Sequence, residues 1–247
     1  SVQKTEFLRE LQLYQGIVER KNTIPILANI LIDAQDGAKE ITLAATDLDI
    51  GLRSRCPADV TKGGVLTLPA KKLFEIVRAL PETDVRISQA KAGSVKVEAE
   101  RFSSRLQTLP REDFPALAEA TGTDVIRLPR AALREMVAKT QFAVTGEDTR
   151  YFLNGALLVF SATSMSLVAT DGRRLALVSA ARGGTTVAGD ITPSDASETP
   201  GQDDGNEETR VILPKKTLWE LARLLDDGDD TVAYERSENH LFFEIDG

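Results

Sequence analysis

The sequence contains very few of the residues on which metal and thiol chemistry depend. Its 247 residues include one cysteine, Cys56, and one histidine, His240. One cysteine cannot form an internal disulfide, and one histidine cannot supply a metal cluster. This usage is typical of the reducing cytoplasm, where we expect the protein to act. Most routes to metal, thiol or Ser-His-Asp catalysis are thereby excluded.

Long apolar runs and nucleotide-binding motifs are also missing. No stretch approaches the roughly 18 apolar residues of a membrane span, and residues 1–11 lack the apolar core of a secretory signal. The sequence has no G-x-x-x-x-G-K-[ST] motif, no G-x-G-x-x-G after a predicted strand, and no C-x-x-C or H-E-x-x-H motif. The acidic run at 226–230 lacks EF-hand spacing and predicts a solvated turn. We therefore expect no cofactor, no bound metal and no enzyme activity.

Positive charge is in deficit, but only in one part of the chain. The net charge is −8, which over the whole chain argues against nucleic acid. Residues 1–122 hold 17 basic and 17 acidic residues, whereas 123–247 hold 13 and 21. The segment 182–209 alone has seven acidic residues and one basic residue, with much Gly, Ser, Thr and Pro. It predicts a long acidic surface loop, which leaves the rest near neutral and a local basic surface possible.

An internal repeat organises the chain. Four blocks of similar sequence recur in the same order. The matching blocks are 8–11 and 133–136, 27–31 and 153–157, 45–47 and 169–171, and 68–80 and 213–225. The offset rises from 125 to 145 residues across the acidic segment, which accounts for the difference. We predict two homologous domains, 1–120 and 121–247, the second carrying the acidic loop 182–209.

Each predicted domain has the same coarse plan. A helix comes first, at 5–20 and at 129–144, and a second helix opens with proline at Pro69 and Pro214. Predicted strands fill most of the rest, at 26–34, 40–47, 49–58, 64–69, 84–90, 94–100, 103–110, 151–160, 166–171, 174–180, 231–237 and 240–246. Antiparallel sheets with segregated helices predict an α+β fold. The second domain has no counterpart of 103–110, so either it is shorter or the chain is cut there.

The triplet Ala-Thr-Asp occurs in both repeats, with Asp47 and Asp171 at equivalent positions. Equivalent positions favour a structural role, in which the Asp side chain closes a turn on its own backbone. The alternative is an acid-catalysed hydrolase that uses both aspartates. The pair Arg173 and Arg174 follows only the second triplet, which points to a function added in that copy.

The predicted helices carry cations at repeated positions. Lys71 and Arg78 align with Lys216 and Arg223, seven residues apart and so on one helical face. Arg9 aligns with Arg134, and further basic residues flank these helices: Arg20, Lys21, Arg127, Arg130 and Lys139. The pattern fits phosphate contacts that do not read sequence. It equally fits a solvated helix face, because glutamates lie on the same helices.

Six blocks of the chain resemble the bacterial DNA polymerase III beta subunit, the sliding clamp. They are TIPILANILI (23–32), ATDLDIGL (45–52), LPAKKLFEIVRALPE (68–82), TLPREDFPAL (108–117), TRYFLNGALL (149–158) and VATDGRRLALVS (168–179). The resemblance implies the DNA-clamp fold: three similar domains per protomer, and a ring of two protomers around double-stranded DNA. Such a clamp performs no chemistry and tethers DNA polymerase III, clamp loader subunits and other proteins with a clamp-binding motif. Only the first two domains are represented, so we expect a fragment that is monomeric, its full-length form a homodimer. The alternative is a clamp-derived scaffold without DNA sliding.

The resemblance also implies roles for individual residues. The partner-peptide cleft would use Leu153, Thr170, Gly172, Arg173, Arg174 and Leu175. DNA contacts would come from Arg9, Arg20, Lys21, Lys71, Arg78, Arg130, Arg134, Arg150, Tyr151, Phe152, Lys216 and Arg223. The ring interface would include Lys72, Ser104 and Leu106. The chain departs from the family at Arg173, where His or Tyr is common, and at Glu147, whose charge should repel phosphate.

Overall fold

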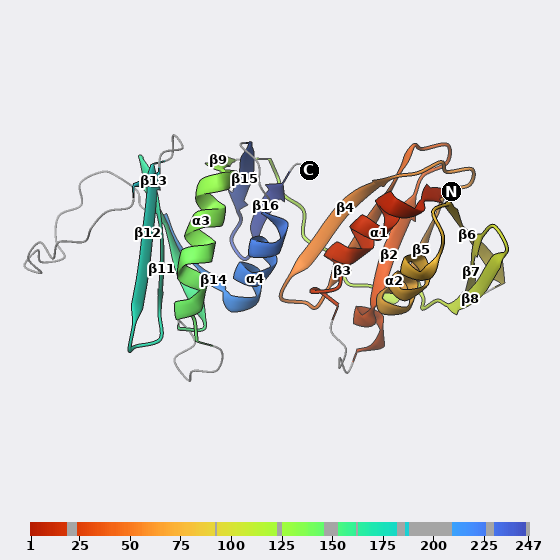
Figure 1. Ribbon diagram of the computed structural model, residues 1–247, viewed down its shortest axis with the longest axis horizontal. Helices are drawn as coiled ribbons and strands as arrows, with labels where there is room; N and C mark the ends of the chain where they lie inside the picture. The colour runs from red at the N-terminus through yellow and green to blue at the C-terminus, as the bar shows by residue number, and fades with distance from the viewer. Residues whose placement is uncertain are drawn as a thin grey trace, which may run out of the picture. The chain divides into compact units, whose positions relative to one another are not determined.

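The computed structural model divides the chain into two compact units, Ser1–Leu117 and Ala118–Gly247. Within them it describes residues 1–18, 24–91, 93–122, 125–145, 153–161, 163–181, 186–187, 209–225 and 230–245. Several residues named above lie outside these ranges: Arg20, Lys21, Glu147, Arg150, Tyr151, Phe152 and nearly all of 182–209. Each unit packs helices against antiparallel strands (Figure 1).

The first unit repeats one pattern, strand–helix–three strands, twice. Its helices are α1 (Lys4–Leu13) and α2 (Ala70–Ala79). Its strands are β1 (Val2–Gln3), β2 (Asn29–Ala34), β3 (Glu40–Thr46), β4 (Gly51–Pro57), β5 (Gly64–Pro69), β6 (Asp84–Lys91), β7 (Ser94–Ala99) and β8 (Phe102–Gln107). Short 3₁₀ helices lie at η1 (Pro25–Ala28) and η2 (Arg111–Asp113).

The two halves of the first unit exchange a strand. The sheets have the orders β4-β3-β2-β5 and β1-β6-β7-β8. Thus β5, which leads into α2, pairs with β2 and sets Thr67 opposite Leu31. In the same way β1, which leads into α1, pairs with β6 and sets Val2 opposite Val85. Each half completes the other's sheet, and so neither half has a full sheet by itself.

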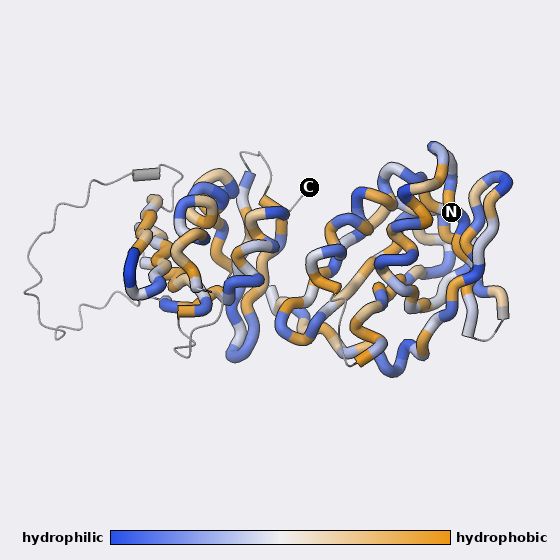
Figure 2. The backbone as a smooth tube through the Cα atoms, turned by 60° about the horizontal axis from the view of Figure 1, so that its bottom comes forward, coloured by the Kyte–Doolittle hydropathy of each residue, from blue (hydrophilic) through white to orange (hydrophobic). Residues whose placement is uncertain are grey.

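The core of the first unit lies between the helices and the sheets. Apolar residues on α1 and α2 recur at helical spacing, and Phe7, Leu11, Leu73 and Val77 are fully buried. Burying a side chain of this size stabilises the fold by about 1.5–3 kcal/mol. Hydrophobic and hydrophilic positions alternate along the helices and strands (Figure 2), as elements with one buried face require.

The second unit has the same plan. Its helices are α3 (Arg130–Thr140), continued by the 3₁₀ helix η3 (Gln141–Ala143), and α4 (Lys215–Leu224). Its strands are β9 (Ile126–Pro129), β10 (Gly155–Phe160), β11 (Ser164–Thr170), β12 (Leu175–Ala181), β13 (Thr186–Val187), β14 (Thr209–Pro214), β15 (Thr231–Arg236) and β16 (Leu241–Ile245). The described strands form sheets of order β13-β12-β11-β10-β14 and β16-β15-β9. The helices α3 and α4 pack on the first of these, with α3 against β11 and β12 and α4 against β10 and β14.

The predicted α+β fold is confirmed, and the differences concern element ends and several strands that were not predicted. The helix predicted over 5–20 ends at Leu13. Tyr14 then enters the core, where its hydroxyl donates to the Leu43 carbonyl at 2.7 Å. The predicted strand 26–34 begins as η1, because Pro25 starts a 3₁₀ turn. The short strands β1, β9 and β13 were not predicted, because two to four residues carry no period-2 signal. The six-residue strand β14, which follows the predicted acidic loop, was missed as well. No described helix has the length and apolarity that a membrane crossing requires.

Candidate functional site

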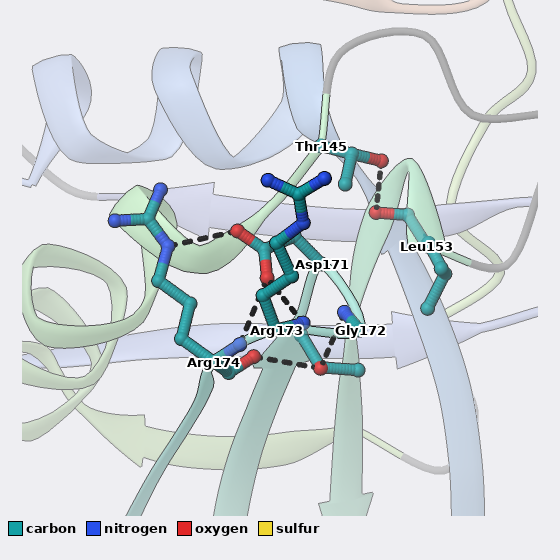
Figure 3. Close-up of polar contacts among 7 residues, drawn as sticks. Thr145, Leu153, Asp171, Gly172, Arg173 and Arg174 are labelled. Atoms are coloured by element: carbon teal, nitrogen blue, oxygen red, sulfur yellow. Dashed lines mark hydrogen bonds and ion pairs between the residues drawn. The ribbon is translucent and has the colours of Figure 1, made fainter.

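The arginine-containing sequence in the second repeat forms a tight hairpin turn between β11 and β12. The last strand pair is Thr170 with Leu175. One oxygen of the Asp171 carboxylate accepts the N–H groups of Arg173 and Arg174, each at 2.9 Å. The Thr170 hydroxyl accepts from the Gly172 N–H at 3.1 Å and donates to the Arg174 carbonyl at 2.7 Å. Gly172 has φ +83°, in the left-handed region that favours glycine. Figure 3 shows this network.

The Arg174 side chain is held in place by two neighbours. Its Nε donates to the second oxygen of Asp171 at 2.8 Å, and its guanidinium lies 5.3 Å from the centre of the Phe142 ring. The two backbone N–H groups, followed by the Arg174 side chain, hold the pKa of Asp171 below its usual value. The carboxylate therefore stays ionised at neutral pH. Arg173 is exposed at the tip of the turn.

The other residues predicted for the partner cleft differ in how much surface they expose. Leu175 is 62% exposed, an unusual value for a large apolar side chain. Leu153 lies two residues before β10, the strand beside β11 (Figure 3), and is only 6% exposed. Its carbonyl accepts hydrogen bonds from the N–H and hydroxyl of Thr145, at 3.2 and 3.0 Å. The structure thus gathers Thr170 to Leu175 on one turn, whereas Leu153 is a buried residue bonded to Thr145.

The first unit contains the matching turn. The Asp47 carboxylate accepts the N–H groups of Asp49 and Ile50 at 3.0 and 2.7 Å, and the Thr46 hydroxyl accepts from Leu48 at 3.0 Å. The prediction that both aspartates close turns on their own backbone is confirmed. In the first copy Asp49 and Ile50 stand where the second has Arg173 and Arg174. The two turns therefore have the same backbone arrangement but carry different side chains.

The helix cations expected from the repeat are mostly accessible. Arg9, Lys71, Arg78, Arg134 and Arg223 are exposed, and Lys216 is half-buried. Several pair with a glutamate of the same helix: Arg9 with Glu10 at 3.6 Å, Lys71 with Glu75 at 3.9 Å, and Arg223 with Glu220 at 2.5 Å. Lys71 and Glu75 are both more than half exposed, and a surface pair of that kind contributes about 0–1 kcal/mol.

The structure corrects the expectation that Arg130 contacts DNA. Its side chain is 4% exposed, and its Nε lies 2.8 Å from Asp230 Oδ1. The backbone N–H of Arg130 also donates to the Asp230 carbonyl at 3.0 Å. A buried guanidinium engaged in this way cannot reach a phosphate, so Arg130 joins the start of α3 to the segment before β15 and leaves the DNA-contact set.

The structure also removes Leu106 from the residues expected at the ring interface. It is 2% exposed and belongs to the core of the first unit, because alternate residues of β8 face inward. Lys72 is exposed and Ser104 is half-buried. Lys72 borders a shallow hollow that Ile76 and Phe102 also line. Phe102 is 38% exposed and was not among the residues expected at the ring interface. Its position, two residues before Ser104 on the same strand face, was a signal that the sequence offered.

Comparison with known proteins assigns both units. The model of the N-terminal domain of the DNA polymerase III beta subunit matches residues 1–118, and that of its central domain matches 127–188. These domains follow one another along the chain as the two units do. The chain belongs to the beta sliding clamp family. The resemblance drawn from the six sequence blocks is thereby confirmed.

Similar beta sliding clamps come from several bacteria. Those of Pseudomonas putida and Escherichia coli K12 are 34% and 32% identical to this chain over 245 and 242 residues, 98% of it in each case. The DNA polymerase III subunit beta of Pseudomonas aeruginosa superposes with a TM-score of 0.82 at 32% identity, covering 99% of this chain and 61% of that one. A Caulobacter crescentus beta sliding clamp, with PEG bound to a putative beta-motif tethering region, gives 0.81 at 34% identity, covering 98% of this chain and 61% of that one. The chain spans about 60% of the length of the curated relatives it matches.

Proposed function

We propose that the protein acts, at full length, as a DNA sliding clamp. Two protomers close a ring around double-stranded DNA, and the ring tethers the replicative polymerase and other partners to its template. The proposal is carried by the successive matches to the N-terminal and central clamp domains. The clamp converts binding into topological linkage and catalyses no reaction, which agrees with the use of Asp47 and Asp171 as turn residues.

The DNA contact in this proposal is electrostatic and weak. Arg9, Lys71, Arg78, Arg134 and Arg223 lie on exposed helix faces. Contacts to phosphate carry no sequence information. The neighbouring glutamates lower the local positive charge and so limit each contact. Loose contacts of this kind let a closed ring move along the duplex.

The partner contact is assigned to the turn Thr170–Leu175. It combines an exposed leucine, an arginine fixed by Asp171 and Phe142, and a glycine that exposes its backbone. Apolar anchors of a partner peptide would pack on Leu175 and Leu153. The stem of Arg173 would cover an apolar side chain, where family members often have an aromatic residue.

Retention on circular DNA tests the ring. The full-length protein is loaded onto a closed plasmid with its clamp loader and separated from free protein by gel filtration in high salt. We expect retention on the circle and loss when a single cut linearises it. Equal loss from both forms would favour the alternative function, a clamp-derived scaffold that does not slide on DNA.

Isothermal titration tests the cleft separately. The full-length protein is titrated with a peptide carrying the clamp-binding segment of a DNA polymerase III subunit. The variant Arg174→Ala, Leu175→Ala should bind at least about tenfold more weakly. Asp49→Ala alters the matching turn of the first unit and serves as the control. Unchanged affinity in the double variant would overturn the cleft assignment without affecting the ring.

A further inference from the structure

An aromatic ring stands at the same position on the second helix of each unit. Phe74 of α2 aligns with Trp219 of α4, at the offset of 145 residues that relates 68–80 to 213–225. Trp219 is 45% exposed and is the only tryptophan in the 247-residue sequence. Phe74 is partly buried and packs against the core of the first unit. Both helices therefore keep a ring beside their exposed face.

Each of these rings contacts a cation of its own helix. The guanidinium carbon of Arg78 lies 5.4 Å from the centre of the Phe74 ring. Lys215 Nζ lies 5.0 Å from the centre of the Trp219 ring. A cation within about 6 Å of an aromatic ring is attracted to the electron-rich face. Residues four apart lie on one side of a helix, which is why both pairs form.

A ring differs from a carboxylate as the partner of a cation. Lys71 of α2 and Arg223 of α4 each pair with a glutamate of the same helix, whose negative charge opposes theirs. An aromatic ring has no net charge, so a cation held by it keeps its full attraction for an anion. A side chain that is already held also loses less freedom when it binds. The two ring-held cations are therefore well prepared to bind phosphate.

Both pairs lie on helices that carry cations assigned to DNA. Arg78 is itself one of them, and it is exposed. On α4, Lys215, Trp219 and Arg223 are spaced by four residues and form one stripe along the helix. The backbone N–H of Lys215 donates to the Asn154 carbonyl at 2.9 Å, which fixes the start of that stripe. Lys215 is not among the DNA contacts that the family resemblance implied.

We propose that Phe74 and Trp219 are positioning residues, which hold Arg78 and Lys215 ready to bind the phosphates of duplex DNA. Lys215 thereby joins the residues that contact DNA. The contacts carry no sequence information, because they reach phosphates only. The inference rests on the proposed clamp function, since it needs DNA beside these helices, and it does not depend on the partner cleft.

Binding of the 247-residue chain to a short fluorescein-labelled duplex tests the inference, with anisotropy measured at several salt concentrations. Arg78→Gln with Lys215→Gln should weaken binding at least about tenfold. It should also lower the slope of the logarithm of the binding constant against the logarithm of salt concentration by about 2. Phe74→Leu with Trp219→Leu keeps every charge and should weaken binding about threefold.

A double-mutant cycle separates positioning from a general effect on the fold. In the chain that already carries Arg78→Gln and Lys215→Gln, the two ring substitutions should have no further effect on DNA binding. Equal losses in both backgrounds would show that the rings act without the cations, and would overturn the inference. Trp219→Phe keeps a ring and should bind DNA more tightly than Trp219→Leu does.

A control variant and a spectroscopic signal complete the test. Phe102→Leu with Phe142→Leu replaces two exposed rings outside α2 and α4, and should bind DNA as the wild-type chain does. Acrylamide quenching of the Trp219 emission should decrease when DNA is added, because the duplex covers the ring. Unchanged affinity in the cation variant, with the full-length ring still retained on circular DNA, would overturn the inference and leave the clamp function standing. No binding of the wild-type chain to the duplex at low salt would overturn the inference as well.

Discussion

Leu48 and Gly172 occupy the same position in two equivalent turns, with φ of +82° and +83°. Each N–H donates to the threonine two residues earlier, and each turn is closed by an aspartate. Only glycine adopts this backbone conformation without steric cost. The first unit therefore holds a strained leucine, 60% exposed, where the second has an unstrained glycine.

Two separate substitutions, each replacing one of these residues by the other's type, should change the stability of the two units in opposite directions. Leu48→Gly should raise the free energy of unfolding of the first unit by about 0.5–1 kcal/mol, the relief of strain exceeding the added chain entropy. Gly172→Leu should lower that of the second unit by about 1 kcal/mol. Urea unfolding followed by hydrogen exchange resolves the two units. Leu48→Ala keeps the strain and is the control, so an equal gain there would contradict this explanation.

Two arginines of α3, one turn apart, should behave differently. Arg130→Ala should lower the free energy of unfolding by roughly 2 kcal/mol, because the ion pair between the buried guanidinium and Asp230 is lost. Arg134→Ala should leave stability within about 0.5 kcal/mol. The same variant should change DNA binding: a plot of the logarithm of the duplex-DNA binding constant against the logarithm of salt concentration should have a slope smaller by about 1. Thermal unfolding and DNA titrations across salt concentrations measure both; a DNA effect confined to Arg130→Ala would reverse the assignment.

Glu235 should make the second unit sensitive to acid. Its carboxylate accepts the hydroxyl and N–H of Thr121, at 2.5 and 2.7 Å, and the N–H of Gly122 at 2.9 Å. These bonds, the Thr121 hydroxyl first, lower its pKa. Its stabilising contribution is thus complete above the unfolded pKa of about 4.3 and is lost as pH falls through the lower folded pKa.

The variant Glu235→Gln isolates this contribution. Urea midpoints measured from pH 6 to pH 3 should fall more steeply for the wild-type chain than for the variant. The exposed Glu244 provides the control variant, Glu244→Gln, which should keep the wild-type slope. Parallel curves for the wild-type chain and Glu235→Gln would show that the network contributes nothing to acid sensitivity.

Cys56 should be inert while the chain is folded. It is fully buried, and burial, aided by the Glu10 charge, raises the pKa of its thiol to about 12. A disulfide exchange reagent at pH 8 should label it only in denaturant. Ser103→Cys, on the exposed surface of β8, should react at once in the native chain. Labelling of Cys56 at a comparable native rate would show that the first unit opens easily.

Prediction from sequence succeeded where a pattern was repeated. The paired Ala-Thr-Asp triplets indicated turn aspartates, and the backbone N–H groups that donate to the Asp47 and Asp171 carboxylates confirm them. It failed where a residue's direction depended on a distant partner. Arg130 was expected among the DNA-contacting cations, yet Asp230, a hundred residues away, holds it in the interior.

The sequence by itself determined the two-fold repeat, the α+β class and the family, because these follow from local periodicity and from the order of motifs along the chain. Tertiary structure decided which side chains reach solvent. Leu106 is buried and Ile212 is exposed, although both alternate along strands in the same manner. The difference arises because the packing of the helices decides which face of each strand is covered: Leu106 packs in the core of the first unit, whereas on β14 it is Leu213, the neighbour of Ile212, that packs in the core of the second.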